Sequence, residues 1–250
     1  MVRFTRSLLR LPLLLALVAL GVFSLLFRRP RTRAARAEWL HRFCVTSLRR
    51  LGVSVRSRGA FPPAGAVISN HMGYLDIVAF AALGPCVFVS KSEIAGWPVL
   101  GWITTQSGTV YVRRGRGGSA DRARSELRTV AAEGVPVVFF PEGTSGNGSS
   151  VLPFRTGLLA DCIETGEPIT AAFLSYRLTR PNAPGSAALL PYWDDTPLAT
   201  HIFRILGLRG IAVEIAFADA PIPFSPAALA DRHLAAAEAR AAVLALKSDA

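Results

Sequence analysis

An uncharged apolar run near the start of the chain sets the strongest constraint on how this sequence can fold. The run, LPLLLALVALGVFSLLF at residues 11–27, follows Arg3, Arg6 and Arg10. As a helix its 17 residues would extend roughly 25 Å, slightly less than the roughly 30 Å hydrocarbon core of a bilayer. Its side chains must be covered either by lipid or by the rest of the protein.

The sequence that follows this run favours a membrane anchor. Residues 28–36 are RRPRTRAAR, and no small-residue cleavage site of a secretory signal peptide follows Phe27. A signal peptide and a buried core helix remain the alternatives for residues 11–27. Residues 36–51 place apolar residues on one side and several arginines elsewhere, which predicts an amphipathic helix at the membrane interface.

The positive charge of the chain is confined to this N-terminal segment. The formal net charge is +11, yet residues 1–60 hold thirteen arginines and a single acidic residue, Glu38. The remaining 190 residues carry 15 basic and 16 acidic side chains. Arginines beside an anionic leaflet contribute roughly 1 kcal/mol each, and aromatic residues for stacking on bases are not interleaved with them. Membrane lipids are therefore the expected partner, and nucleic acid is not.

From residue 53 onward, short β-branched runs alternate with helical stretches. This alternation predicts an α/β fold with a mostly parallel or mixed sheet covered by helices, in one domain at 53–250 after an N-terminal segment at 1–52. The expected strands are Val53–Arg58, Ala66–Ser69, Val87–Ser90, Thr109–Val112, Val135–Phe140, Ile169–Leu174 and Ile211–Phe217. The expected helices are Tyr74–Leu83, Trp97–Thr105, Ser119–Ala132, Gly157–Glu164 and Pro226–Leu246.

One strand-to-helix turn carries a pair of ionisable residues. AVISNHMGYLDIVAF, residues 66–80, places His71 and Asp76 where an α/β sheet usually holds its reactive groups. A neutral imidazole can remove a proton from a hydroxyl, and a carboxylate on its other nitrogen fixes the tautomer. The spacing alone is a weak signal, because His233 and Glu238 share it on a polar helix that we expect to face solvent.

Two further strand ends deliver polar residues. VPVVFFPEGTSGNG, residues 135–148, brings Glu142 out of a buried strand, and SGTVYVRRGRGG, residues 107–118, brings Arg113 and Arg114 into a glycine-rich turn. Arginine pairs bidentately with phosphate, and strand alternation lets one of the two reach a shared site. Taken alone, the glutamate suits a loop residue satisfied by nearby amides, and the arginines suit a basic surface turn.

The three motifs together resemble one family. NHMGYLD (70–76), VYVRR (110–114) and FPEGT (140–144) occur in the order, and with approximately the spacing, of the glycerolipid acyltransferases. The sequence resembles the 1-acylglycerol-3-phosphate acyltransferases over about residues 60–220, and LPFRTG (152–157) is similar to the Phe-x-x-Gly element of that family.

This resemblance implies an enzyme that moves a fatty acyl group from acyl-CoA or acyl-carrier protein to the hydroxyl of a lysophospholipid. The implied acceptor is 1-acyl-glycerol-3-phosphate, which would give phosphatidate, and neither a cofactor nor a metal is implied. His71 would be the general base and Asp76 its partner. The residues implied to bind the substrate are Arg114, Arg113, Glu142, Gly143, Thr144 and Pro168.

The sequence also departs from the family pattern. Ala171 stands where the family often has a second proline, and Ser145 stands where it has an arginine. The GTSGNG segment and the later PYWDD…H (191–201) resemble the lyso-ornithine-lipid branch and related bacterial lysophospholipid acyltransferases, so lyso-ornithine lipid is the alternative acceptor. A membrane-bound lipid-binding protein without turnover is the alternative from another class.

Other enzyme classes find less support. A serine hydrolase motif, G-x-S-x-G, fails at Asn147, and no phosphate-binding loop or metal-ligand spacing occurs. The three cysteines are far apart and odd in number, which suits a reducing compartment. We therefore expect the protein at the cell membrane, with its catalytic domain on the cytoplasmic side.

Overall fold

The computed structural model describes residues 2–112 and 119–247, and within them seven strands form one mixed sheet. The sheet order is β1-β7-β6-β2-β5-β3-β4. β6, β2, β5, β3 and β4 run parallel, β7 is antiparallel to β6, and β1 is parallel to β7. The strands are β1 (Val53–Arg58), β2 (Ala66–Ser69), β3 (Val87–Lys91), β4 (Val110–Val112), β5 (Val137–Phe139), β6 (Ile169–Leu178) and β7 (Ile211–Phe217).

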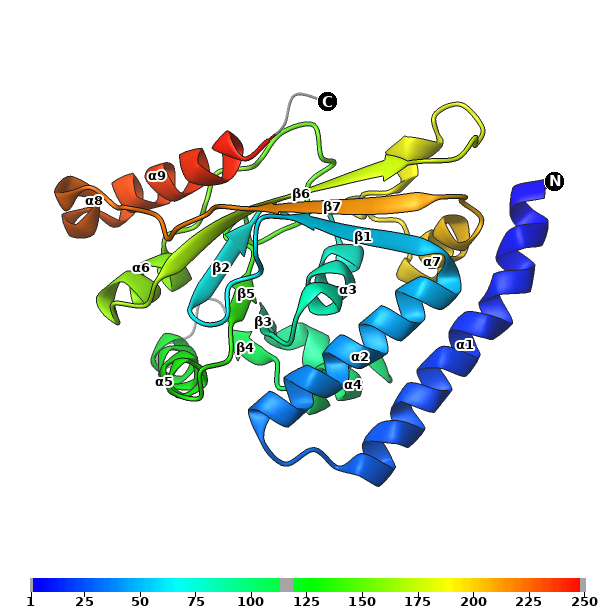
Figure 1. Ribbon diagram of the computed structural model, residues 1–250, viewed down its shortest axis with the longest axis horizontal. Coiled ribbons are helices and arrows are strands. Elements are labelled where there is room, and N and C mark those ends of the chain that lie inside the picture. Colours follow the sequence, from blue (N-terminus) through cyan, green and yellow to red (C-terminus); the bar gives the residue numbers. More distant parts are fainter. Residues whose placement is uncertain (1, 113–118, 248–250) are drawn as a thin grey trace.

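Helices cover both faces of the sheet, which Figure 1 shows nearly edge-on. They are α1 (Val2–Arg28), α2 (Arg33–Leu51), α3 (Tyr74–Leu83), α4 (Leu100–Gln106), α5 (Ser119–Ala132), α6 (Gly157–Glu164), α7 (Leu198–Leu206), α8 (Pro226–Ala230) and α9 (Arg232–Ala245), with 3₁₀ turns at Ser92–Gly96 and Ser186–Leu189. α2, α3 and α4 contribute to the core on one face, and α5, α6 and α9 to the core on the other. The predicted α/β fold with a mixed sheet and an N-terminal apolar helix is confirmed.

The central strand β2 shows why the sheet is buried on both sides. Its four residues, AVIS, are all buried, and Val67 and Ile68 have no exposed surface. β-branched residues suit a strand that is covered by helices on both faces. Val67 packs with α3 and Ile68 packs in the opposite core cluster. Side chains alternate between the two faces, so this strand ties both cores together and fixes where its C-terminal end emerges.

Several observed elements differ from the expected ones by more than a residue or two. The helix expected from Trp97 begins only at Leu100, because Pro98 and a left-handed Val99 (φ +60°) interrupt it. The last expected helix divides into α8 and α9 at Asp231, which caps α9 by accepting from the backbone N–H groups of its first turn. β6 is longer than expected because antiparallel β7 pairs with it as far as Leu178. The nine-residue helix α7 was not expected from the sequence.

The N-terminal helix α1 is long and apolar enough to cross a membrane, and much of its apolar surface is exposed. It is nevertheless fastened to the rest of the protein. Arg6 donates to the carbonyl of Gly207 just after α7, at 2.5 Å, and Arg10 donates to the carbonyl of Leu208, at 2.8 Å. Gly21 allows α1 to approach α2, because a Cβ at this position would lie 2.6 Å from the ring of Phe43.

The predicted amphipathic helix is present as α2, and part of its apolar side packs on the sheet domain. Leu40, Cys44 and Leu48 are buried and belong to the same core cluster as Val67. α2 packs against α3 along its length, as the ribbon shows. The sheet domain therefore covers these three side chains, and the interfacial position of residues 36–51 stays a prediction.

Candidate active site

His71 and Asp76 meet at the turn that joins β2 to α3. Nδ1 of His71 lies 2.7 Å from Oδ2 of Asp76. The Asp76 side chain has no exposed surface, whereas 19% of the His71 side chain is exposed. A carboxylate only accepts hydrogen bonds, so Nδ1 carries the proton and Nε2 has a lone pair. Nothing among the described residues hydrogen-bonds to Nε2, which leaves it available to a substrate hydroxyl.

The Asp76 carboxylate is held by four donors. Besides His71, its Oδ2 accepts from the backbone N–H of Met72 at 2.6 Å and of Gly73 at 3.0 Å. Its Oδ1 accepts from the hydroxyl of Tyr176 on β6. Hydrogen bonds to a carboxylate favour its charged form and offset its loss of hydration. Gly73 has a φ of +146°, and a Cβ there would lie 2.8 Å from Cβ of Tyr192, so only glycine suits this turn.

Glu142 holds the backbone on the other side of His71. Its Oε1 accepts from the backbone N–H of His71 and its Oε2 from that of Leu152, each at 2.7 Å. The side chain is only 4% exposed, and burial raises the pKa of this carboxyl above its ordinary value although both hydrogen bonds lower it. The acid from the FPEGT motif is thus joined directly to the backbone of the histidine from NHMGYLD.

The imidazole of His71 is also positioned by its surroundings. Phe140, just after β5, stacks on the ring with a centroid distance of 4.1 Å and an interplanar angle of 12°. The carbonyl of His71 accepts from the N–H of Gly146 at 2.8 Å. The carbonyl of Met72 accepts from the N–H of Tyr192 at 2.7 Å. Three residues that are far from His71 in the sequence, Phe140, Gly146 and Tyr192, therefore contact the same turn.

Asn70 and Tyr176 were not anticipated from the sequence. The Asn70 side chain accepts from the N–H of Leu174 at 2.7 Å and donates to the carbonyl of the same residue at 2.9 Å. The Asn70 side chain thereby makes the two hydrogen bonds to the β6 backbone that a strand residue would make, at a point where β2 has already ended. An asparagine directly after a buried strand was a signal for Asn70. No local pattern marks Tyr176, which lies 100 residues from its partner.

The remaining predicted site residues are distributed unevenly. Gly143 directly follows Glu142 in this turn, and Thr144 beside it is exposed. Arg113 and Arg114 lie outside the described residues, although β4 ends just before them at the same edge as β2. Pro168 precedes β6 at the opposite end of the strands, so the structure does not bring it to His71.

Two basic residues that were not predicted from the sequence lie at the same edge of the sheet as His71. Lys91 ends β3 beside Val112 and is exposed. Arg155, also exposed, donates from Nε to the carbonyl of Glu142 at 3.3 Å. Within residues 2–112 and 119–247, no group of three or more His, Cys, Asp or Glu side chains is arranged to hold a metal ion.

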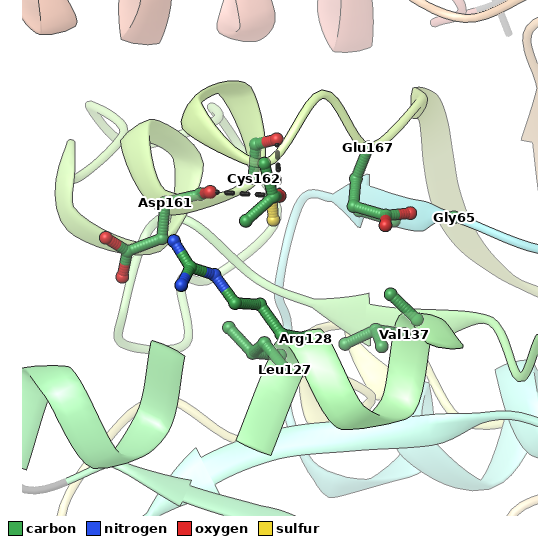
Figure 2. Close-up of a pocket in the computed structure, with 10 residues that line it drawn as sticks. Gly65, Leu127, Arg128, Val137, Asp161, Cys162 and Glu167 are labelled. Atoms are coloured by element: carbon green, nitrogen blue, oxygen red, sulfur yellow. Dashed lines mark hydrogen bonds between the residues drawn. The ribbon is translucent and has the colours of Figure 1, made fainter. Parts of the chain in front are cut away.

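A small hollow at the other end of the strands gathers a different set of ionisable residues (Figure 2). It lies beside Gly65 and Val137, where β2 and β5 begin, and has a volume of about 20 Å³. Arg128, Asp161 and Glu167 line it. A space of this size holds about one water molecule and excludes a substrate.

Comparisons with known proteins agree on one family. A family model described as Acyltransferase matches residues 53–175. The chain is 36% identical, over 231 residues, to a lyso-ornithine lipid O-acyltransferase of Pseudomonas aeruginosa, covering 87% of this chain and 85% of the relative. It is 30% identical, over 168 residues, to a 1-acyl-sn-glycerol-3-phosphate acyltransferase of Neisseria gonorrhoeae, covering 67% and 64% of the two chains.

The fold is also similar to a solved structure. The crystal structure of the 1-acyl-sn-glycerophosphate acyltransferase from Thermotoga maritima superposes with a TM-score of 0.62. The match covers 98% of this chain and all of the other, at 19% sequence identity. At that identity the likeness establishes the shared architecture, including the N-terminal helices.

Proposed function

The chain belongs to the acyltransferase family, and from this premise we propose that it transfers a fatty acyl group from a thioester to the hydroxyl of a lysolipid. The observation that carries the proposal is the 2.7 Å contact between Nδ1 of His71 and the buried Asp76 carboxylate. That contact leaves Nε2 as the base of a ring that is partly exposed. Family membership makes this an enzyme, so the alternative of lipid binding without turnover loses its support.

The reaction follows from these groups. The lysolipid hydroxyl gives its proton to Nε2 of His71 while its oxygen attacks the thioester carbonyl carbon. Asp76 stabilises the imidazolium that forms and keeps the ring in place. The carbon–sulfur bond then breaks, the imidazolium proton passes to the departing thiolate, and the products are an ester and a free thiol. The hydroxyl is itself the nucleophile, so no acyl-enzyme intermediate is required.

Two acceptors agree with the chain, and the donor is either acyl-CoA or acyl-carrier protein. Lysophosphatidate is supported by the motif order and by the Neisseria relative. Lyso-ornithine lipid is supported by the Pseudomonas relative, which is more similar and matches more of the chain, and by Ser145 where the family often has arginine. We propose lyso-ornithine lipid as the better substrate of the two on this ground.

The experiment that tests the proposal is a direct comparison of the two acceptors. Purified full-length protein is mixed with labelled acyl-CoA or acyl-carrier protein and with each lysolipid, and kcat/KM is measured for every pair. Ester formation on at least one lysolipid, abolished in His71→Ala, is expected. A higher kcat/KM for lysophosphatidate would reverse the choice of acceptor. No transfer from either donor to either lipid would contradict the proposed function.

The N-terminal helix supports a membrane location, and we propose that the catalytic domain lies on the cytoplasmic side. Leu9, Leu20 and Phe23 on α1 are 74%, 65% and 58% exposed, and we propose that they contact lipid. Residues 1–52 would then bring the domain at 53–250 to its lipid substrates, although α2 within the first segment also covers the core.

Substitution at those positions tests the membrane contact better than deletion, which would uncover Trp39 and Phe43. The triple change Leu9→Asp, Leu20→Asp and Phe23→Asp should release the full chain from anionic vesicles in a flotation assay. Leu229→Asp with Leu234→Asp is the control, because these leucines are also exposed but lie on α8 and α9. Equal release by both sets would remove the special role of α1.

A further inference from the structure

We propose that Tyr176 is a positioning residue for the transfer reaction: its hydroxyl holds the Asp76 carboxylate and, through it, the imidazole of His71. This inference rests on the proposed function, since it concerns the same proton transfer. Tyr176 itself would not contact the substrate. It belongs to β6, far in sequence from the motif that contains the other two residues.

The path of β6 explains how this tyrosine reaches the site. β6 pairs with β2 only as far as Ala172, which lies beside Ser69. The strand then continues to Leu178, supported on its other side by β7, and so runs past the turn that follows β2. Asn70 bonds to the backbone of Leu174. Tyr176, two residues further along, projects from the same face of the strand and meets Asp76.

The two oxygens of Asp76 depend on different partners. Oδ2 accepts from His71 and from two backbone N–H groups of its own turn. Oδ1 accepts from the hydroxyl of Tyr176, which is its one donor among the described residues. Since the carboxylate has no exposed surface, water cannot readily replace that donor. The turn thus supplies the three donors to Oδ2, and β6 supplies the donor to Oδ1.

Tyr176 remains a donor throughout the working pH range. Burial, and then the negative charge of Asp76, raise the pKa of its hydroxyl well above the ordinary value. The other titratable groups around the pair are Glu142, from the turn after β5, and Tyr74, from α3. Burial raises the pKa of the Tyr74 hydroxyl above the ordinary tyrosine range, so it too stays protonated.

The variant Tyr176→Phe keeps the ring and removes only the donor. We expect kcat to fall about 10-fold, with little change in KM for the lysolipid, because the hydroxyl acts on the base and not on the acceptor. A carboxylate with one donor fewer also attracts the protonated imidazole more strongly. The acidic limb of the kcat–pH profile should therefore move to higher pH.

Val213→Ala is the matched control for a change of stability. Val213 is buried and lies opposite Tyr176 in the register of β6 and β7, but it makes no side-chain hydrogen bond. It should lower the denaturation midpoint while leaving the acidic limb of the profile in place. If Tyr176→Phe behaved like Val213→Ala, with an unmoved limb, the positioning role would be wrong.

A spectroscopic measurement separates this inference from the proposed function. With ¹⁵N-histidine labelling, the His71 ring signal, assigned by its loss in His71→Ala, should titrate with a higher midpoint in Tyr176→Phe than in wild type. That result supports the positioning role even if no acyl transfer is detected, which would contradict only the proposed function. An unchanged midpoint would overturn the inference. If Tyr176→Phe fails to fold, the test is made on wild type. A cross-peak between the Tyr176 hydroxyl proton and the His71 Nδ1 proton is then expected, and its absence would overturn the inference.

Discussion

The two ends of the parallel strands carry similar ionisable side chains and arrange them differently. At the C-terminal end, the carboxylates of Asp76 and Glu142 are buried and accept hydrogen bonds from backbone N–H groups of the catalytic turn. At the N-terminal end, Arg128, Asp161 and Glu167 surround a hollow of about 20 Å³ (Figure 2). Charged residues near a sheet edge are therefore common to both ends.

What distinguishes the C-terminal end is that both acids bond to one partly exposed histidine, His71. Asp76 bonds to the His71 ring, and Glu142 bonds to the His71 backbone. The arrangement fixes the base while leaving Nε2 open to a substrate. The hollow at the other end has no such reactive atom among its lining groups, because burial raises the pKa of the Cys162 thiol there to about 12 and suppresses its thiolate.

The largest expected effect comes from the base itself. His71→Ala should lower kcat by about 10²–10⁴-fold, and Asp76→Asn should also be strongly impaired because the ring loses its fixed tautomer. Arg128→Ala, at the other end of the strands, should keep nearly wild-type activity. Thermal denaturation of all three would show that they are folded. A loss in Arg128→Ala comparable to that in His71→Ala would break the comparison.

A smaller effect is expected from Arg114, which the sequence places after β4. If the acceptor carries a phosphate, Arg114→Ala should remove charged hydrogen bonds of about 1.5–3 kcal/mol and lower kcat/KM for lysophosphatidate by one to two powers of ten. Arg114→Lys should restore only part, because lysine lacks the planar fork. Arg128→Ala again is the matched arginine control. Unchanged kinetics in Arg114→Ala, with Arg113→Ala inactive, would move the role to the neighbouring arginine.

Glu142→Gln should have a further, smaller effect on activity. One oxygen of the amide can still accept, but its NH₂ group would face a backbone N–H of His71 or Leu152. We expect a loss of about 1–3 kcal/mol in unfolding free energy and about a 10-fold fall in kcat as the turn shifts. Glu167→Gln is the matched control and should change neither quantity appreciably. Equal behaviour of the two variants would mean that burial at the catalytic end has no special consequence.

Local patterns in the sequence predicted most of the fold. The strand Ala66–Ser69 and the helix Tyr74–Leu83 appear with the predicted bounds, because β-branched runs and apolar helical periodicity are properties of short segments. α7 was missed because its nine residues are bounded by irregular segments on both sides. The apolar side of α2 was assigned to lipid because an amphipathic pattern does not state what covers it.

The site was predictable to the same extent. His71 and Asp76 lie within one turn of chain, so their contact could be expected from spacing and position. The bond from Glu142 to the backbone of His71 crosses 71 residues, and that from Tyr176 to Asp76 crosses 100. Such contacts depend on the order and register of the strands, which the sequence does not state. Pro168 was grouped with His71 by a motif match, but it lies at the start of β2, whereas His71 follows the end of that strand.

The smallest expected effect is a difference in how stability depends on pH. Burial raises the pKa of Glu142, so the folded protein holds that proton more tightly than the unfolded chain does. The group's contribution to stability is therefore complete below the ordinary glutamate pKa and is lost as pH rises through the raised value. Glu142→Gln cannot titrate there.

Urea unfolding of wild type and Glu142→Gln between about pH 4 and about pH 7 measures this difference. The unfolding free energy of wild type relative to the variant should be most favourable at the acidic end and should decline toward neutral pH, with Glu167→Gln as the control for loss of a carboxyl group. The opposite slope would mean that the two backbone hydrogen bonds from His71 and Leu152 outweigh burial. Glu142 would then be held as an anion stabilised by its two backbone hydrogen bonds, and burial would not set the sign of its contribution to stability.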